Sequence, residues 1–190
     1  MYPAVFRAMN PDPIILISPI GEIPDWISKA VAETVEKMFG FKTRVAFLLE
    51  DLLFAWDEKR TQYYSTAILG ELEKKAPKDC IKVLAITRED LFIPILTHVY
   101  GEAQLGGRAA VISISRLIEY PEAGDLKKSR ERVVKEAAHE LGHAFDLRHC
   151  EDQHCIMHYC RKLADVDAKS DNFCRYCRIF LSDAVKALAK

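Results

Sequence analysis

Two histidines four residues apart, with a glutamate after the first, constrain this chain more than any other stretch: His139-Glu140-Leu141-Gly142-His143. On an α-helix such histidines lie on one face, ~6 Å apart along the axis, so both imidazoles can bind one metal ion. Glu140 is rotated by about 100° from His139, which places its carboxylate beside the ion. A third histidine, His149, follows six residues after His143. The pattern predicts a helix, a sharp turn and a zinc site with three protein ligands and an open fourth position.

Chance is the alternative for the first two histidines, since surface histidines at this spacing need not bind a metal. The cysteines that follow argue against it. Cys150 and Cys155 are separated by four residues and Cys174 and Cys177 by two, which is typical of a tetrahedral structural zinc site. Two disulfides or a redox-active C-x-x-C remain alternatives for these four.

The two other cysteines have weaker contexts. Cys80 begins a strand-like run and is expected to be a small buried apolar side chain. Cys160 is expected either to be buried or to be a spare thiol near the metal.

Composition excludes several classes of function. The 190 residues carry a net charge of −1, which gives no basic field for nucleic acid. Residues 1–10 lack the basic start and apolar run of a signal peptide, and no apolar run reaches the ~18 residues that a membrane span needs. We expect a cytoplasmic monomer without nucleic-acid or membrane partners. A single domain, residues 1–190, is expected, with an N-terminal lobe at 1–145 and a small C-terminal lobe at 146–190.

Apolar patterning predicts alternating strands and helices before the histidine motif. Strands are expected at 14–18, 42–48, 81–87, 98–103 and 109–115, and helices at 24–39 and 63–75. A long helix is expected to begin near Asp125 or Ser129 and to end near Ala144. Its inward stripe would consist of Leu126, Val133, Val134, Ala137, Leu141 and Phe145.

Mostly irregular chain is expected from there to Asp171. Loops of this length are uncommon inside compact domains unless they have a function, and a structural zinc would hold this one in place. A short closing helix would contain Ile179, Phe180, Val185 and Leu188. The order of elements predicts an α/β fold of the α+β kind, with a mixed sheet covered by helices.

The extended motif His139-Glu140-x-x-His143-x-x-Asp146-x-x-His149-Cys150-x4-Cys155-x-Met157, with Cys174-x-x-Cys177 downstream, resembles the archaemetzincin family of zinc metalloproteases. The resemblance covers the C-terminal third, and weaker family-like stretches lie at 60–63, 101–103 and 107–110. It implies a metzincin fold: a mixed sheet of roughly five strands, an active-site helix, and a loop-rich C-terminal lobe held by a structural zinc.

The same resemblance implies the site residues. The catalytic zinc would be bound by His139, His143 and His149, and the structural zinc by Cys150, Cys155, Cys174 and Cys177. Glu140 would be the general base that acts on a zinc-bound water during peptide-bond hydrolysis. Met157 aligns with the methionine of the turn beneath the metal.

Four further residues have alternative roles. Tyr159, two places past Met157, resembles the tyrosine of astacin-type metzincins and would stabilise the transition state, unless it only packs at the cleft wall. His154 and His158 are expected at the surface or behind the ligands, and His98 is expected to pack or hydrogen-bond. A peptide substrate could add to the predicted strand at 98–103.

Asp146 departs from the family pattern, which has glycine there. Glycine allows the left-handed backbone that turns the chain towards the third ligand, and aspartate tolerates this conformation better than most residues. We therefore expect the turn to form and His149 to ligate. The spacing from Met157 to Cys174 also differs from the pattern by one residue, within a loop.

Two rivals to a protease remain from the sequence. The first is a zinc-bound peptide-recognition or regulatory protein with weak or no protease activity, which Asp146 keeps open. The second is a purely structural two-zinc module, which leaves Glu140 without a role.

Overall fold

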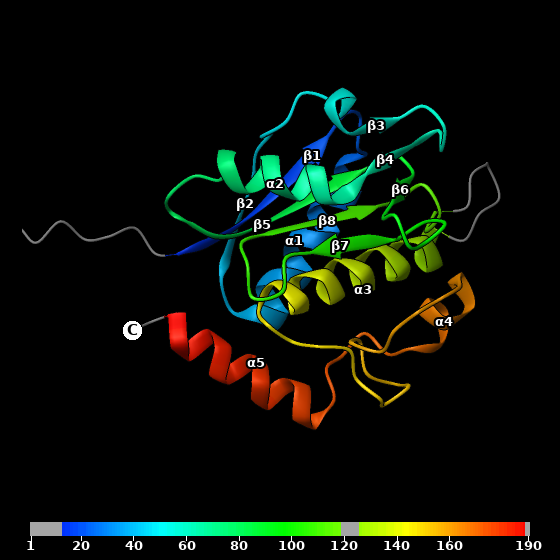
Figure 1. Ribbon diagram of the computed structural model, residues 1–190. Helices are drawn as coiled ribbons and strands as arrows, with labels where there is room; N and C mark the ends of the chain where they lie inside the picture. Colours follow the sequence, from blue (N-terminus) through cyan, green and yellow to red (C-terminus); the bar gives the residue numbers. More distant parts are fainter. Residues whose placement is uncertain (1–12, 119–125, 189–190) are drawn as a thin grey trace, which may run out of the picture.

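A five-stranded mixed sheet, in the order β2-β1-β5-β8-β7, forms the centre of the computed structural model, which describes residues 13–118 and 126–188 (Figure 1). Four strands are parallel: β1 (Ile14–Ile20), β2 (Lys42–Val45), β5 (Cys80–Thr87) and β8 (Ala109–Ser113). The last strand, β7 (Gly101–Ala103), pairs antiparallel with β8 and forms one edge. The predicted mixed α/β architecture is confirmed.

Helices cover both faces of this sheet. Helix α2 (Ser65–Lys75) lies on one face, and α1 (Asp25–Phe39) and α3 (Leu126–Ala144) lie on the other (Figure 1). In β1, Ile15 and Ile17 belong to the core on the α1 and α3 side, whereas Leu16 belongs to the core beneath α2. Because alternate side chains of a strand point to opposite faces, a strand between two helical layers reads as a continuous apolar run.

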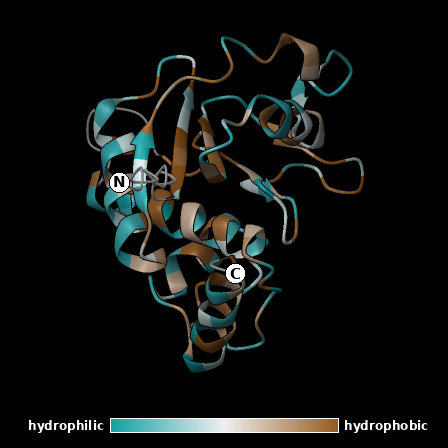
Figure 2. Cartoon of the chain, turned by 90° about the vertical axis from the view of Figure 1, so that its left-hand side faces the viewer, coloured by the Kyte–Doolittle hydropathy of each residue, from teal (hydrophilic) through white to brown (hydrophobic). Residues whose placement is uncertain are grey.

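Hydrophilic and hydrophobic residues alternate along the helices, as in amphipathic helices that bury one face (Figure 2). Helix α1 ends where expected, because Gly40 takes the left-handed conformation, with φ 78°, and its N–H caps the carbonyl of Glu36. Helix α3 ends at Ala144, also as predicted. The suggested cap Asp125 lies outside the described residues.

Several boundaries differ from the sequence prediction. Strand β2 stops at Val45, and residues 62–64 form a strand, not the first turn of α2. That strand, β4 (Gln62–Tyr64), belongs to a small second sheet with β3 (Trp56–Asp57) and β6 (Leu91–Phe92), after the 3-10 turn η1 (Leu53–Ala55). Residues 98–100 precede β7, and β8 ends at Ser113.

The predicted inward stripe of α3 is wrong at its first residue. Leu126, the first described residue of this helix, is 71 % exposed. Val134 is only partly buried, whereas Val133, Ala137, Leu141 and Phe145 are buried in the core as predicted.

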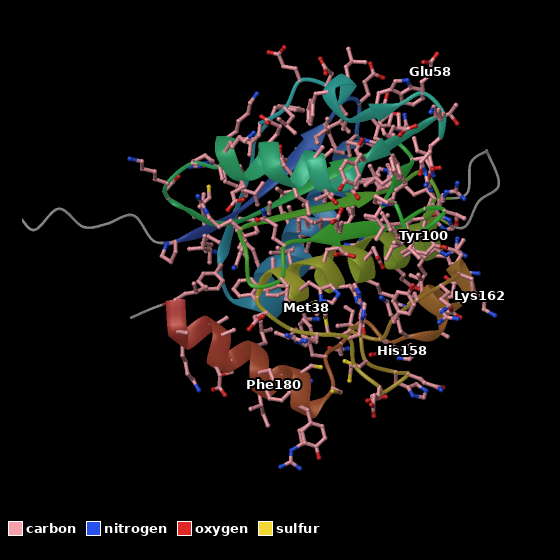
Figure 3. The ribbon with its side chains drawn as sticks, in the orientation of Figure 1. Met38, Glu58, Tyr100, His158, Lys162 and Phe180 are labelled. Atoms are coloured by element: carbon pink, nitrogen blue, oxygen red, sulfur yellow. The ribbon has the colours of Figure 1, made fainter. Side chains whose placement is uncertain are left out.

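The chain after α3 contains more helix than the sequence indicated. Helix α4 (Leu163–Ala168) interrupts the segment expected to be irregular, and α5 (Arg175–Leu188) closes the chain (Figure 1). Helix α5 packs through Cys177 and Leu181, whereas Ile179 and Phe180 are exposed (Phe180 is labelled in Figure 3). Across residues 13–118 and 126–188, no helix combines the length and apolar character needed to cross a bilayer.

Candidate active site and metal centres

The three histidines of the motif converge on one point. Helix α3 carries His139 and His143, whose Nε2 atoms lie 3.1 Å apart, and the following turn places His149 Nε2 3.3 Å from His143 Nε2. Two nitrogen ligands of a tetrahedral zinc, each about 2.0–2.1 Å from the metal, are about 3.4 Å apart. The histidine cluster therefore has the spacing that a zinc ion requires.

Hydrogen bonds at the opposite ring nitrogens fix which atoms face this point. His139 Nδ1 lies 2.8 Å from the carbonyl of Ile156, and His143 Nδ1 lies 2.6 Å from that of Leu147. A carbonyl only accepts, so both Nδ1 atoms donate and both Nε2 atoms carry a lone pair. Burial lowers the pKa of His139 and His143, and lowers that of His149 to about 4, which favours neutral imidazoles. Several lone pairs that face each other at this distance repel unless a cation lies between them.

The turn that delivers His149 depends on Asp146. Its φ is 68°, the left-handed conformation expected from the sequence. The N–H of Asp146 donates to the carbonyl of His143 over 2.9 Å, and the N–H of Leu147 donates to that of Gly142 over 3.0 Å. These bonds satisfy the carbonyls at the end of α3 while the chain reverses.

The side chain of Glu140, on α3, is buried against the edge strand β7. A side chain at Gly101 would place its Cβ 2.6 Å from Glu140 Cγ, so glycine is required for β7 to approach the helix. Burial raises the pKa of Glu140 well above its usual range, and the neighbouring carboxylate of Glu136 raises it further. The Lys169 ammonium acts in the opposite direction.

Met157 lies beneath the same helix and is fully buried. Its sulfur occupies the space that a side chain at Gly142 would fill. The preceding residue, Ile156, supplies the carbonyl that holds His139. Met157 therefore belongs to a turn that supports the histidine cluster from below.

The second cluster brings Cys150, Cys155, Cys174 and Cys177 together, with one sulfur from each within 4.8 Å of the others. All six cysteines are free thiols, so the structure contains neither of the two disulfides considered above. Cys150 Sγ and Cys174 Sγ are 3.8 Å apart, the separation of two thiolates bound at about 2.3 Å to a tetrahedral zinc.

Backbone N–H groups also donate to two sulfurs of this cluster. The N–H of Cys174 donates to Cys155 Sγ over 3.3 Å, and the N–H of Cys177 donates to Cys174 Sγ over 3.5 Å. The cysteine cluster thus offers four sulfur ligands and no open position, as a structural zinc requires.

The other histidines and cysteines lie outside the two clusters. His154 is exposed, whereas His158 Nδ1 donates to the carbonyl of Cys150 over 3.0 Å. His98 precedes β7, not within a strand, and packs edge to face on Tyr100 (labelled in Figure 3). Cys80 is buried at the start of β5 as expected, and Cys160 is half-buried.

A cavity of about 550 Å³ opens in front of the histidines. Strand β7 forms one wall, and the segment with Tyr159 forms another. The Tyr159 ring lies 4.9 Å from that of His149, centroid to centroid, and is 40 % exposed. Tyr159 therefore faces the cavity beside a histidine of the cluster.

Two buried charged residues in this cavity, Glu136 and Lys169, were not expected there from the sequence. Glu136 precedes Glu140 by one helical turn, and this spacing was a signal that could have placed it on the same face. Lys169 carries no comparable signal, because it reaches the cavity only through the path of the chain after Met157.

Comparisons with known proteins agree on one family. Residues 53–183 match the sequence model of Peptidase family M54. The archaemetzincin of Methanopyrus kandleri is 44 % identical over 133 residues, which cover 70 % of this chain and 73 % of that protein. The archaemetzincin of Methanocaldococcus jannaschii is 34 % identical over 173 residues, covering 89 % and 93 %.

Solved structures of such proteins share the fold. The crystal structure of the Methanopyrus kandleri archaemetzincin matches with a TM-score of 0.79 and 38 % identity, over 92 % of this chain and 96 % of that one. The Archaeoglobus fulgidus archaemetzincin, crystallised with malonate, matches with a TM-score of 0.73 and 34 % identity, over 88 % and 99 %.

Proposed function

Since the chain belongs to Peptidase family M54, the archaemetzincin family of zinc metallopeptidases, we propose that His139, His143 and His149 hold the zinc at which it cleaves peptide bonds. The convergence of their ring nitrogens supports this assignment, with Nδ1 of His139 and His143 turned to backbone carbonyls. When bound, zinc supplies a Lewis acid that polarises a carbonyl and lowers the pKa of water from 15.7 to about 7.

Glu140 is the proposed general base. Its carboxylate is buried beside the histidine cluster, where its raised pKa suits a group that takes a proton from water and passes it to the leaving amine. Tyr159 is the proposed donor to the oxygen of the substrate carbonyl as negative charge develops there. Its exposure in the cavity, beside His149, allows that contact.

Strand β7 is the proposed backbone site for a peptide substrate. The carbonyl of Tyr100 accepts from the N–H of Ser113, and the N–H of Gln104 donates to the carbonyl of Ala109. Hydrogen-bonded and non-hydrogen-bonded pairs alternate along an antiparallel ladder, so Gly101 and Ala103 direct their N–H and C=O groups away from β8. An extended peptide can pair with these groups along the cavity.

A second zinc is proposed at the four cysteines. Its role would be to hold the chain after Asp146, because the segment between the two cysteine pairs contains only the short helix α4. His149 and Cys150 are adjacent, so the proposed structural zinc would fix the residue next to a catalytic ligand.

The experiment is hydrolysis of a peptide library by zinc-loaded wild type and Glu140→Ala, with native mass spectrometry to count zinc. We expect the variant to retain two zinc ions per chain and to lose chelator-sensitive turnover by about 10²-fold or more, the usual contribution of a general base. Hydrolysis by Glu140→Ala at the wild-type rate would refute the role of Glu140. A zinc count below two in the wild type would refute the second site.

A further inference from the structure

A buried ion pair without hydrogen-bond partners lines the cavity beside the proposed base. The Lys169 side chain is 1 % exposed and that of Glu136 is 6 % exposed, and Lys169 Nζ lies 3.6 Å from Glu136 Oε2. In the described part of the chain, these are the two buried side-chain atoms, one nitrogen and one oxygen, that have no hydrogen-bond partner. Buried charges are normally fully hydrogen-bonded, so this pair needs an explanation.

The position of the pair points to substrate recognition. Glu136 and Lys169 line the same cavity as the histidine cluster and Glu140. Glu136 precedes Glu140 by one turn of α3, about 6 Å along the helix axis. One residue of an extended peptide spans ~3.3–3.6 Å. The side chain of a substrate residue next to the cleaved bond is therefore long enough to span the distance to the pair.

The pair is held in place by contacts behind it. Arg132 on α3 donates two hydrogen bonds to Asp167 on α4, of 2.6 and 2.8 Å. Lys135 Nζ donates to the carbonyls of Val166 and Asp167 over 3.1 and 3.2 Å. These bonds fasten α4 to α3, and Lys169 directly follows α4. Lys169 is thus tied to α3 through α4, which it directly follows.

We propose that Lys169 and Glu136 form a specificity subsite for an uncharged carboxamide, the side chain of glutamine or asparagine beside the cleaved bond. The inference rests on the proposed function. A carboxamide carries an acceptor oxygen and a donor nitrogen on one carbon, so two hydrogen bonds of about 2.9 Å can reach atoms 3.6 Å apart. The amide oxygen accepts from Lys169 Nζ, and the amide nitrogen donates to Glu136 Oε2.

Other side chains fit the pair less well. A substrate carboxylate would meet the carboxylate of Glu136, and a substrate ammonium would meet the ammonium of Lys169. An apolar side chain would leave both buried atoms without partners, and a site built to hydrogen-bond its substrate rejects such an analogue strongly. The opposite charges of the pair therefore select for a neutral group that both donates and accepts.

The first test measures cleavage by the zinc-loaded wild type. Its probes are four peptide series that carry glutamine, methionine, glutamate or lysine at each position flanking the cleaved bond. At one of these positions we expect kcat/KM for glutamine to exceed that for methionine, which has a similar length, by about 10- to 100-fold. Equal kcat/KM for glutamine and methionine at both positions would overturn the inference.

The second test measures binding without turnover. Fluorescence anisotropy of the same peptides, labelled and bound to zinc-loaded Glu140→Ala, gives Kd for each side chain. In that background, Glu136→Gln leaves Lys169 unopposed and should shift the preference to glutamate by about tenfold or more. Lys169→Met should shift it to lysine by a similar factor. An unchanged preference in both variants would overturn the inference, and circular dichroism verifies that each is folded.

The control is the exposed ion pair between Asp183 and Lys186 on α5, 3.5 Å apart. The changes Asp183→Asn and Lys186→Met should leave the preference unaltered. Glutamine-selective binding without any hydrolysis would refute the proposed function but support the subsite. Hydrolysis that depends on Glu140 but shows no preference for a carboxamide would refute the subsite alone.

Discussion

Gly142 is the residue in which helix propensity and packing conflict most clearly. Glycine in a helix interior costs about 1 kcal/mol relative to alanine, yet α3 carries it between two histidines. The Met157 sulfur lies where a side chain would begin. Close approach of the turn beneath the helix therefore outweighs the propensity for alanine.

Gly142→Ala should lower the free energy of unfolding by about 1–2 kcal/mol, because the cost of overpacking against Met157 exceeds the gain in helix propensity. The matched control is Gly70→Ala in α2, where no atom lies within 4 Å of the added Cβ. That control should raise the free energy by about 0.5–1 kcal/mol. Urea unfolding measures both, and a stabilised Gly142→Ala would contradict the packing argument.

Substitutions at Asp146 test whether the turn after α3 requires the left-handed conformation. An ordinary L-residue pays about 1–2 kcal/mol for this conformation, and glycine pays almost nothing. With φ at 68°, Asp146→Ala should be less stable than Asp146→Gly by about 1 kcal/mol. Thermal unfolding of the two variants compares them directly, and equal stability would mean that the turn does not require this φ. Equal zinc affinity and equal activity in Asp146→Gly would remove any functional role for the carboxylate.

At the scale of elements, the chain from Asp146 to Cys177 links the histidine cluster to the cysteine cluster. Adjacent α-carbons are only about 3.8 Å apart, so Cys150 limits where His149 can lie. Two hydrogen bonds also connect Cys150 to the turn with Met157. The ring of His158 donates to the Cys150 carbonyl, and the N–H of Cys150 donates to the Met157 carbonyl over 2.9 Å.

Cys150→Ser should therefore reduce zinc occupancy at both clusters, not only at its own. Native mass spectrometry should detect fewer than one zinc per chain, whereas a mutation confined to the cysteine cluster would leave one. Cys80→Ala is the control, since Cys80 lies at the start of β5, outside both clusters, and should retain both metals. A Cys150→Ser protein that folds and keeps the histidine-bound zinc would show that the two clusters are independent.

Elements were predictable where local pattern and tertiary environment agree. The end of α3 follows from the histidine motif and the loss of apolar periodicity after Phe145, and Gly40 marks the end of α1. Strands β3, β4 and β6, each of two or three residues, are too short for periodicity to detect. Helix α4, six residues long, depends on contacts with α3 that sequence spacing does not reveal.

The candidate site was predictable to a similar extent. Metal-ligand residue types at fixed spacing predicted both clusters, because His139 and His143 lie one helical turn apart and the members of each cysteine pair are close in sequence. Lys169 could not be placed, because its position in the cavity depends on the ion pair between Arg132 and Asp167. The requirement for glycine at Gly101 was also hidden, since it arises from the approach of β7 to Glu140.

For the whole molecule, Asp167 contributes a pH-dependent part of stability. The side-chain hydrogen bonds from Arg132, together with the Lys128 ammonium 3.2 Å away, lower the pKa of this carboxyl to about 2. A pKa lowered by folding stabilises the folded state above the unfolded value, ~3.9, and this contribution is lost as pH falls through about 2.

Asp167→Asn should therefore lower the free energy of unfolding by about 2 kcal/mol at pH 7, and the difference from wild type should shrink between pH 4 and 2. Urea unfolding across this range measures the difference. Asp183→Asn, at the exposed ion pair of α5, should change stability by less than about 1 kcal/mol. A difference between Asp167→Asn and wild type that stays constant down to pH 2 would contradict this origin.

The carbonyls that hold His139 and His143 have a consequence for the order of folding. Both belong to chain that follows α3, at Ile156 and Leu147, so the helix alone cannot select the tautomer of either ring. We therefore expect the histidines to bind zinc tightly only after the downstream segment has docked beneath the helix. During synthesis, the histidines of α3 are therefore made before the two carbonyls that orient their rings.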